Sequence, residues 1–373
     1  MKKNILVLNC GSATVKFKVF AQDLQELVSG IVERIGLDGS FFKSSLAKTE
    51  IKKEFKSHEE AIRFILQVLE DNGFGKDSFS KIGHRVVHGG EKFTKPTLLN
   101  TKILKEIESF NDLAPLHNPK NISGIKICLE LLPKAKNYAV FDTAFHSTLP
   151  EKAFRYALPS ELYDDLKIRR YGFHGLSHWY MKEQAVKFLK KKNPNLITCH
   201  LGSGASICAI KNGVSVDTSM GFTPLSGLVM TTRPGDFDPS IILFLLRQGY
   251  NLAEIEKLLN SFSGLKGVCD LADLRDILIL NGYKISGYNL KAKHDAKTKK
   301  MAKLALDMYL YQIQKYLGAY FAVLGGKVDA IVFSAGVGER NTDIRRLILK
   351  SLPFKAKVLV VPADEEKVIA MSI

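Results

Sequence analysis

The segment 199–239 combines glycine, hydroxyl and basic side chains in an order that suits anion binding. An apolar run at 196–201 predicts a buried strand, Gly202 and Gly204 predict a turn, and a second strand is expected over 206–210. Glycines allow backbone N–H groups to converge on one point and allow a ligand to come close. His200, Ser203 and Ser206 add side-chain donors around the turn. We expect a polyanion, such as a chain of phosphates, at this hairpin.

The end of the same segment holds a single arginine, Arg233, between Met230-Thr231-Thr232 and Pro234. A guanidinium embedded among apolar and hydroxyl residues is costly unless an anion pairs with it, and its planar shape fits a bidentate anion. The alternative is an exposed turn built on Pro234-Gly235.

Two further charged residues stand at ends of expected strands. Arg85 lies between apolar neighbours in the strand and glycine turn 82–90, a context that resembles that of Arg233. Asp142 ends the expected strand 138–142, and ligands of open α/β sheets lie beyond the carboxyl ends of strands. We therefore expect Asp142 near a metal or substrate, with a helix cap as the alternative.

Two histidine pairs have spacings that invite a zinc interpretation. His174 and His178 are four residues apart and could share a helix face, and His84 and His88 could share a strand face. Neither pair contains the glutamate of the H-E-x-x-H motif, and no third ligand is indicated. We favour structural or substrate-contacting histidines.

Similar glycine turns recur about half a chain apart. G-S-A at 11–13 resembles G-S-G-A at 202–205, and each stands between two expected strands, which predicts a duplicated domain. The run 329–341 predicts a buried strand, a turn at Gly336 and Gly338, and a helix. It lacks the third glycine of a dinucleotide fingerprint, and the chain contains no P-loop motif. Helices are expected at 58–72, 120–132, 241–247, 252–259, 273–280 and 295–324.

Composition narrows the class of protein. The 373 residues predict two domains, and 46% apolar with 25% charged residues is a globular composition. The net charge of +16 comes from lysines spread along the chain without interleaved aromatics, which argues against nucleic-acid binding. No apolar run approaches a membrane span. Five scattered cysteines form no disulfide pattern and indicate a cytoplasmic protein.

Glycine hairpins, embedded arginines and a carboxylate at a strand end are together the components of phosphoryl transfer. The chain resembles the acetokinase family, of the acetate and sugar kinase/Hsp70/actin superfamily, over nearly its whole length. The motifs that carry the resemblance include L-N-C-G-S-A-T-V-K, G-H-R-V-V-H-G-G, R-R-Y-G-F-H-G-L-S-H, C-H-L-G-S-G-A-S, M-T-T-R-P-G-D-F-D-P and F-S-A-G-V-G-E-R-N.

The resemblance implies an α/β fold of duplicated ribonuclease-H-like (actin/Hsp70-type) domains with a central interdomain cleft. It implies an N-terminal actin-like domain of residues 1–145 plus 367–373 and a C-terminal nucleotide-binding domain of residues 146–366. The implied activity is a carboxyl-accepting phosphotransferase that converts ATP and acetate reversibly into ADP and acetyl phosphate. Mg²⁺ (with Mn²⁺ possible) and a homodimer are implied too, with no nucleic-acid or membrane partner.

The resemblance also assigns roles to residues of this sequence. The implied catalytic residues are Asn9, Arg85, Asp142, His174 and Arg233, and the implied metal residues are Asn9 and Glu365. The implied acetate pocket is Arg85, Val87, Leu116, Phe173 and Pro224, of which the apolar members could equally be core residues. The implied nucleotide residues are Ser12, Thr14, Lys16, His200, Leu201, Gly202, Ser203, Gly204, Asp273, Leu274, Arg275, Gly336, Val337, Gly338 and Asn341.

This sequence departs from the family pattern in two hairpins. Ala13 lacks a hydroxyl that the family usually has, and Ser203 replaces the usual asparagine, so we expect weaker nucleotide binding with activity kept. A propionate or butyrate kinase is the nearest rival, because one methylene is worth only ~1–3 kcal/mol in an apolar pocket. Val87 favours a shallow pocket and therefore acetate. An actin-like switch ATPase, or a nucleotide-binding relative without turnover, stays open as a different class.

Overall fold

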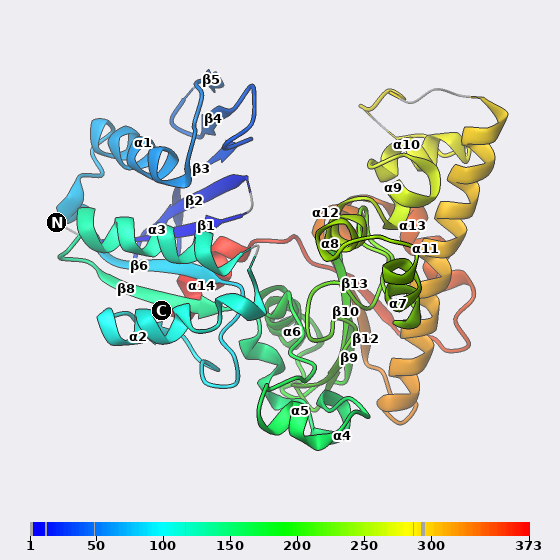
Figure 1. Cartoon of the computed structure of the whole chain (residues 1–373). Coiled ribbons are helices and arrows are strands. Elements are labelled where there is room, and N and C mark those ends of the chain that lie inside the picture. The colour runs from blue at the N-terminus through cyan, green and yellow to red at the C-terminus, as the bar shows by residue number, and fades with distance from the viewer. Residues whose placement is uncertain (1–2, 12, 48, 116, 286, 292–294) are drawn as a thin grey trace. The chain divides into compact units, whose positions relative to one another are not determined.

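The computed structural model describes residues 3–11, 13–47, 49–115, 117–285, 287–291 and 295–373 (Figure 1). The chain forms two compact units. Unit 1 comprises Met1–Ser147 and Asp364–Ile373, and unit 2 comprises Thr148–Ala363. The chain re-enters unit 1 at Asp364, three residues before the boundary at 367 that the resemblance implied. The whole of the last helix therefore belongs to unit 1.

Unit 1 is built on an eight-stranded sheet with the order β5-β4-β3-β2-β1-β6-β8-β7. Its strands are β1 Asn4–Cys10, β2 Thr14–Phe20, β3 Glu26–Glu33, β4 Phe41–Ser44, β5 Ile51–Lys52, β6 Phe79–Val86, β7 Thr97–Leu98 and β8 Lys136–Phe141. Its helices are α1 His58–Asp71, α2 Thr101–Glu108, α3 Asn118–Leu131 and α14 Glu365–Ser372, the last of which returns to this sheet from the far end of the chain (Figure 1).

Unit 2 is built on a five-stranded sheet with the order β11-β10-β9-β12-β13. Its strands are β9 Leu196–Leu201, β10 Ala205–Lys211, β11 Val214–Thr218, β12 Ala330–Ser334 and β13 Lys357–Val360. Its helices are α4 Glu151–Phe154, α5 Ser160–Asp164, α6 Gly175–Leu189, α7 Ser240–Arg247, α8 Leu252–Ser261, α9 Gly264–Cys269, α10 Leu274–Leu280, α11 Ala296–Val323, α12 Ala335–Arg340 and α13 Thr342–Lys350. Two short 3₁₀ helices, Lys76–Ser78 and Asn111–Leu113, belong to unit 1, and a third, Ala144–Thr148, spans the boundary between the units.

The two sheets share one topology. In unit 1, β1, β2 and β3 form an antiparallel meander, and β6 and β8 then add in parallel on the other side of β1. In unit 2, β9, β10 and β11 form the same meander, and β12 and β13 add in parallel beside β9. This repeat confirms the duplicated α/β fold that the two glycine turns predict.

The two faces of the unit 1 sheet are covered differently. Leu6, Leu8 and Cys10 alternate toward the core that includes Ile62 and Ile65 of α1. The opposite face carries Gly83, where a side chain would stand 2.4 Å from Ile369 of α14. Glycine at this position therefore lets α14 lie directly on the sheet and bring its first residues to the strand ends.

Most predicted elements are present, but the turn predicted at Gly336 and Gly338 is not. Asn212 and Gly213 have φ of 51° and 80°, the conformation of a tight hairpin turn between β10 and β11. Gly336 and Gly338, by contrast, lie inside α12, which begins directly after β12. The residue with the left-handed backbone there is Ala335, with φ of 65°.

Among the helices that the structure describes, none is long and apolar enough to span a bilayer.

Candidate active site

In unit 1 the strand register aligns three polar side chains on one face of the sheet. Lys16 on β2 pairs directly with Asn9 on β1, and Leu8 pairs with His84, which sets Asn9 beside Arg85 on β6. Directly paired residues point to the same face of a sheet. Asp142 follows β8 immediately, so the row ends at the carboxyl edge of the parallel strands, where the sequence predicted a site.

Arg85 is the centre of this cluster. Its Nη2 and Nε atoms lie 2.5 and 3.1 Å from Oδ2 of the buried Asp142. Its Nη1 atom has longer contacts, 3.3 Å to Asn9 Oδ1 and 3.5 Å to Glu365 Oε2. Burial alone would lower the pKa of Arg85, but the attraction of Asp142 and Glu365 raises it above its ordinary value. Arg85 is therefore a permanent cation that Asp142 orients, with one nitrogen only loosely held.

The first turn of α14 adds two acids to the cluster. The Nδ2 atom of Asn9 donates to Glu365 Oε2 at 3.0 Å and to Glu366 Oε1 at 2.9 Å. Burial and the neighbouring Glu365 raise the pKa of Glu366, although Asn9 and Lys16 oppose the rise. Carboxylates thus outnumber the guanidinium that they surround, and an added cation would relieve their repulsion.

Glu366 is the acid that sequence reasoning missed. It is buried, whereas surface helices usually expose glutamate. A helical reading of the tail would have found it, because Glu366, Ile369 and Ile373 share the spacing of one helix face.

In unit 2 the glycine turn lies beside two of the predicted catalytic residues. A Cβ atom placed on Gly204 would stand 3.2 Å from Arg233 Nη2 and 3.4 Å from His174 Nε2. The half-buried Arg233 donates to the carbonyl oxygen of Pro224 at 2.8 Å, and its pKa is lowered by burial. Within the described ranges, no carboxylate pairs with Arg233. It differs in this respect from Arg85, so the two arginines do not share the environment that their sequence contexts suggested.

Three histidines support this corner of unit 2. The rings of His174 and His200 stack with their centroids 4.1 Å apart. His200 Nδ1 lies 2.8 Å from Ser177 Oγ on α6. His174 and His178 both reach the hydroxyl of Ser206 on β10, which makes them partners in one hydrogen-bond network.

A cavity of about 750 Å³ lies next to the same turn, wholly within unit 2. It contains most of the residues implied for the nucleotide, namely Gly202, Ser203, Asp273, Leu274, Arg275, Gly336, Val337 and Asn341. A side chain at Gly336 would meet nothing within 4 Å, so glycine leaves this wall open. The basic residues Lys284 and Arg340 and the aromatic Tyr288 also line the cavity, although none of them was among the predicted site residues. A volume of this size suits a nucleotide-sized ligand.

Asp273 and Arg275 form one wall of the cavity as a unit. Asp273 caps helix α10, and its Oδ2 atom lies 2.6 Å from Arg275 Nη2 and 3.1 Å from the hydroxyl of Tyr288. The Arg275 guanidinium lies 3.9 Å from the centre of the Tyr288 ring. The pKa of Asp273 is lowered by its hydrogen bond to Arg275, so the carboxylate is an acceptor at neutral pH.

Other predicted residues lie elsewhere. Leu201 and Gly338 are buried against each other, since a Cβ on Gly338 would stand 3.4 Å from that of Leu201. Thr14 begins β2 in unit 1, where its carbonyl closes the first hairpin with the Gly11 N–H. The apolar pocket residues divide between the units, with Val87 in unit 1 and Phe173 and Pro224 in unit 2. That pocket stays a prediction, and Ser12 and Leu116 are outside the described residues.

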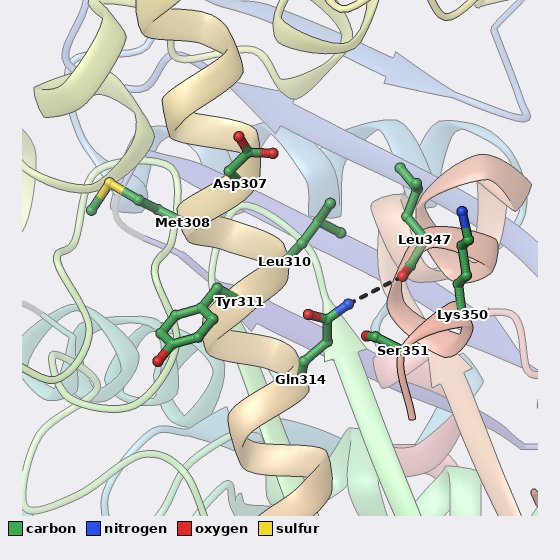
Figure 2. A pocket seen from close by; sticks show the side chains of 8 residues that line it. All are labelled: Asp307, Met308, Leu310, Tyr311, Gln314, Leu347, Lys350 and Ser351. Carbon is green, nitrogen blue, oxygen red and sulfur yellow. Dashed lines mark hydrogen bonds between the residues drawn. The ribbon is translucent and has the colours of Figure 1, made fainter. Parts of the chain in front are cut away.

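A second cavity, of about 680 Å³, lies on unit 2 between α11 and α13 (Figure 2). It is lined by Asp307, Met308, Leu310, Tyr311, Gln314, Leu347, Lys350 and Ser351. Gln314 Nε2 crosses it to donate to the carbonyl oxygen of Leu347 at 3.1 Å (Figure 2). None of the predicted site residues lies here.

Comparison with known proteins places the chain in a family. Residues 4–371 match the model of the acetokinase family. The chain is 42% identical to an acetate kinase of Halothermothrix orenii, covering 98% of this chain and 97% of that protein. It is 44% identical to an acetate kinase of Clostridium botulinum, at 98% and 97% coverage.

Solved structures agree. A propionate kinase from Francisella tularensis has a TM-score of 0.89 at 37% identity, and an acetate kinase from Porphyromonas gingivalis has 0.86 at 39%. Each alignment covers 99% of this chain and 98% of the other. The chain therefore belongs to the acetokinase family.

Proposed function

We propose that this protein transfers the γ-phosphoryl group of ATP to acetate, reversibly and with Mg²⁺, giving acetyl phosphate and ADP. The observation that carries the proposal is Arg233, a half-buried cation without a carboxylate partner in the described residues. It lies beside His174 and the Gly204 turn, and the turn borders the large cavity of unit 2. A desolvated cation next to a glycine turn, where a ligand can approach the backbone closely, is a site that an anion completes.

Unit 2 supplies the nucleotide side of this proposal. Asp273, Arg275 and Tyr288 would hold the nucleoside, and the turn at Gly202 and Gly204 would hold the phosphates. Arg233 and His174 would bind the oxygens of the transferring phosphoryl group. A loose phosphoryl-transfer transition state requires positioning and charge neutralisation more than a strong base. The proposed groups provide both.

Unit 1 supplies the acceptor and metal side. The loosely held Nη1 atom of Arg85 is the donor that can turn to a carboxylate oxygen, while Asp142 keeps the guanidinium plane fixed. Val87 would contact the methyl group of acetate.

The surplus of acids around Asn9 fits a divalent cation, and Glu365, Glu366 and Asn9 would hold it. Among the described residues, no three acidic, histidine or cysteine side chains form a metal site by themselves. This agrees with Mg²⁺, which commonly uses one or two carboxylates together with substrate phosphates. When bound, Mg²⁺ would neutralise phosphate charge.

Propionate is the second candidate acceptor. The structure from Francisella tularensis, at a TM-score of 0.89, is named a propionate kinase. Acetate and propionate differ by one methylene, so discrimination between them is expected to be modest.

The test is hydroxamate trapping of the acyl phosphate formed from ATP, Mg²⁺ and acetate, propionate or butyrate. We expect product with acetate, the highest kcat/KM for acetate, and a loss of about 10² or more in kcat for both Arg85→Ala and Arg233→Ala. The exposed Arg63→Ala is the control, because its partners are the surface acids Glu59 and Glu130. ATP hydrolysis that no short carboxylic acid affects would instead indicate a switch ATPase, and bound ATP without turnover would indicate a non-catalytic relative.

We also propose a homodimer that uses α7. This helix, S-I-I-L-F-L-L-R, has no buried residue, and Leu243 and Phe244 are 53% and 57% exposed. Contiguous exposed apolar side chains are typical of interfaces. Light scattering of Phe244→Glu should show a monomer, and an unchanged dimer would exclude this face.

The five cysteines are buried free thiols, which supports a reducing cytoplasm.

A further inference from the structure

A chain of buried polar side chains connects the core of unit 2 to His174. His174 Nδ1 lies 2.9 Å from Ser206 Oγ, and the same oxygen lies 2.8 Å from His178 Nε2. His178 Nδ1 in turn lies 2.8 Å from Thr198 Oγ1. Ser206, His178 and Thr198 are fully buried, so water does not compete for these hydrogen bonds.

The single hydroxyl proton of Ser206 couples the tautomers of His174 and His178. Ser206 has one hydroxyl proton, so it can donate to only one of the two rings, and when it does so it accepts from the other. Thr198 Oγ1 lies 3.5 Å from the carbonyl oxygen of Cys208, which can only accept. This end sets the direction: Thr198 donates to the carbonyl, His178 Nδ1–H to Thr198, Ser206 to His178 Nε2, and His174 Nδ1–H to Ser206.

The backbone of His174 is held for the same purpose. Its φ and ψ of 57° and 24° are left-handed, at the residue before helix α6. Residues other than glycine adopt this conformation rarely, and such positions concentrate at functional sites. The result is that Nδ1 meets Ser206 while Nε2 faces the Gly204 turn.

We propose that His178 and Ser206 are positioning residues that fix His174 in one ring orientation and one tautomer, with its proton on Nδ1 and with Nε2 toward the Gly204 turn. A proton taken up at Nε2 then makes His174 a cation that donates to an anionic oxygen, and no other bond of the chain has to be remade. The catalytic part of this inference rests on the proposed function, in which Nε2 meets the transferring phosphoryl group.

The first test is Ser206→Ala, with Ser215→Ala as the matched control. Ser215 is also a fully buried serine of the same sheet, and its hydroxyl lies 3.3 Å from the Cys208 thiol. We expect Ser206→Ala to lower kcat by about tenfold to 100-fold, by analogy with the loss seen when a partner that orients a metal-bound histidine is removed. The KM values should change less than about twofold, because ground-state binding is retained. Equal losses in both variants would overturn the proposal.

The second test needs no turnover. Nitrogen-15 correlation spectra of the imidazoles, with His174 assigned through His174→Asn, should show one tautomer protonated at Nδ1, and both tautomers in Ser206→Ala. A His174 protonated at Nε2, or a mixture already present in the wild type, would overturn the proposal. If the wild type forms no acyl phosphate but shows these spectra, the positioning chain stands and the proposed function fails.

A conservative variant separates positioning from packing at His178. His178→Gln keeps a polar group able to reach Ser206, whereas His178→Leu fills similar space without one. We expect His178→Gln to retain kcat within about tenfold and the Nδ1–H tautomer of His174, while His178→Leu loses both. Retention of the tautomer in His178→Leu would remove His178 from the chain.

Discussion

Replacing Glu366 with glutamine should make the protein more stable and a poorer binder of Mg²⁺. Glu365 and Glu366 accept hydrogen bonds of 3.0 and 2.9 Å from the same Asn9 nitrogen, so the two accepting oxygens lie no more than about 6 Å apart. Two like charges at that distance repel by about 3 kcal/mol at an effective dielectric constant of about 20. Glutamine removes the repulsion and keeps an oxygen that can accept from Asn9.

Two losses reduce the gain. The hydrogen bond from Asn9 ceases to be charge-assisted, which costs about 1 kcal/mol. The attraction that Lys16 exerts on Glu366 also disappears. A net gain of about 1–2 kcal/mol remains, which corresponds to a rise of roughly 2–8 °C in Tm for a unit of this size.

The gain has a defined dependence on pH. The pKa of Glu366 is raised above its ordinary value of 4.5, so the folded state prefers the protonated acid. The wild type therefore loses stability as the pH rises from about 4.5 through the raised pKa, and Glu366→Gln avoids that loss. The two proteins should have equal stability below pH 4.5 and differ most at neutral pH.

Thermal unfolding from pH 4 to 8, with and without Mg²⁺ and ADP, measures both effects. We expect the variant to require about 10–100 times more Mg²⁺ for half-maximal activity. Glu130→Gln is the control, because Glu130 is exposed in a surface ion pair and should change stability by less than about 0.5 kcal/mol. A less stable Glu366→Gln protein at pH 7, with the Mg²⁺ requirement unchanged, would refute the reasoning.

Three other outcomes follow from single residues. Burial lowers the pKa of His84 to about 4, so the folded protein should lose about 3 kcal/mol of stability as the pH falls from about 6.5 to about 4, and His84→Gln should flatten that part of a pH–stability curve. Ser203→Asn should lower the KM for ATP, since it adds an amide to the wall of the unit 2 cavity, the proposed nucleotide site; an unchanged KM would exclude Ser203 as the cause of weaker binding. Val87→Ala should raise the ratio of kcat/KM for propionate over acetate by about tenfold, and an unchanged ratio would remove Val87 from the acceptor pocket.

The parts of the site that sequence reasoning located are those fixed by local pattern. Arg85 and Asp142 each stand near the end of an apolar strand, and parallel strands bring such ends to one edge, whereas Asn9 was implied only by the family resemblance. The glycine hairpin at Gly202 and Gly204 followed from turn chemistry in the same way. These residues could be placed because strand register depends on alternation along the chain.

The parts that sequence reasoning missed depend on tertiary packing. Glu366 enters the site only because α14 lies on Gly83, a contact between residues more than 280 positions apart. The different states of Arg85 and Arg233 could not be read from their neighbours in sequence, because the acids around Arg85, Asp142 and Glu365, lie 57 and 280 positions away from it. Gly336 reads as a turn residue, yet the helix already starts at Ala335.

The return of residues 364–373 to unit 1 has a consequence for how the protein is made. Unit 2 is one continuous segment and can fold as soon as it leaves the ribosome, whereas the sheet of unit 1 lacks the helix that covers its Gly83 face. At about 5–20 residues per second, the N-terminal strands wait roughly 10–45 s for that helix. Glu365 and Glu366 arrive with it, so the acidic cluster is assembled last. A nascent or prematurely terminated chain would thus contain the unit 2 cavity, the proposed nucleotide site, before it contained the acids of α14.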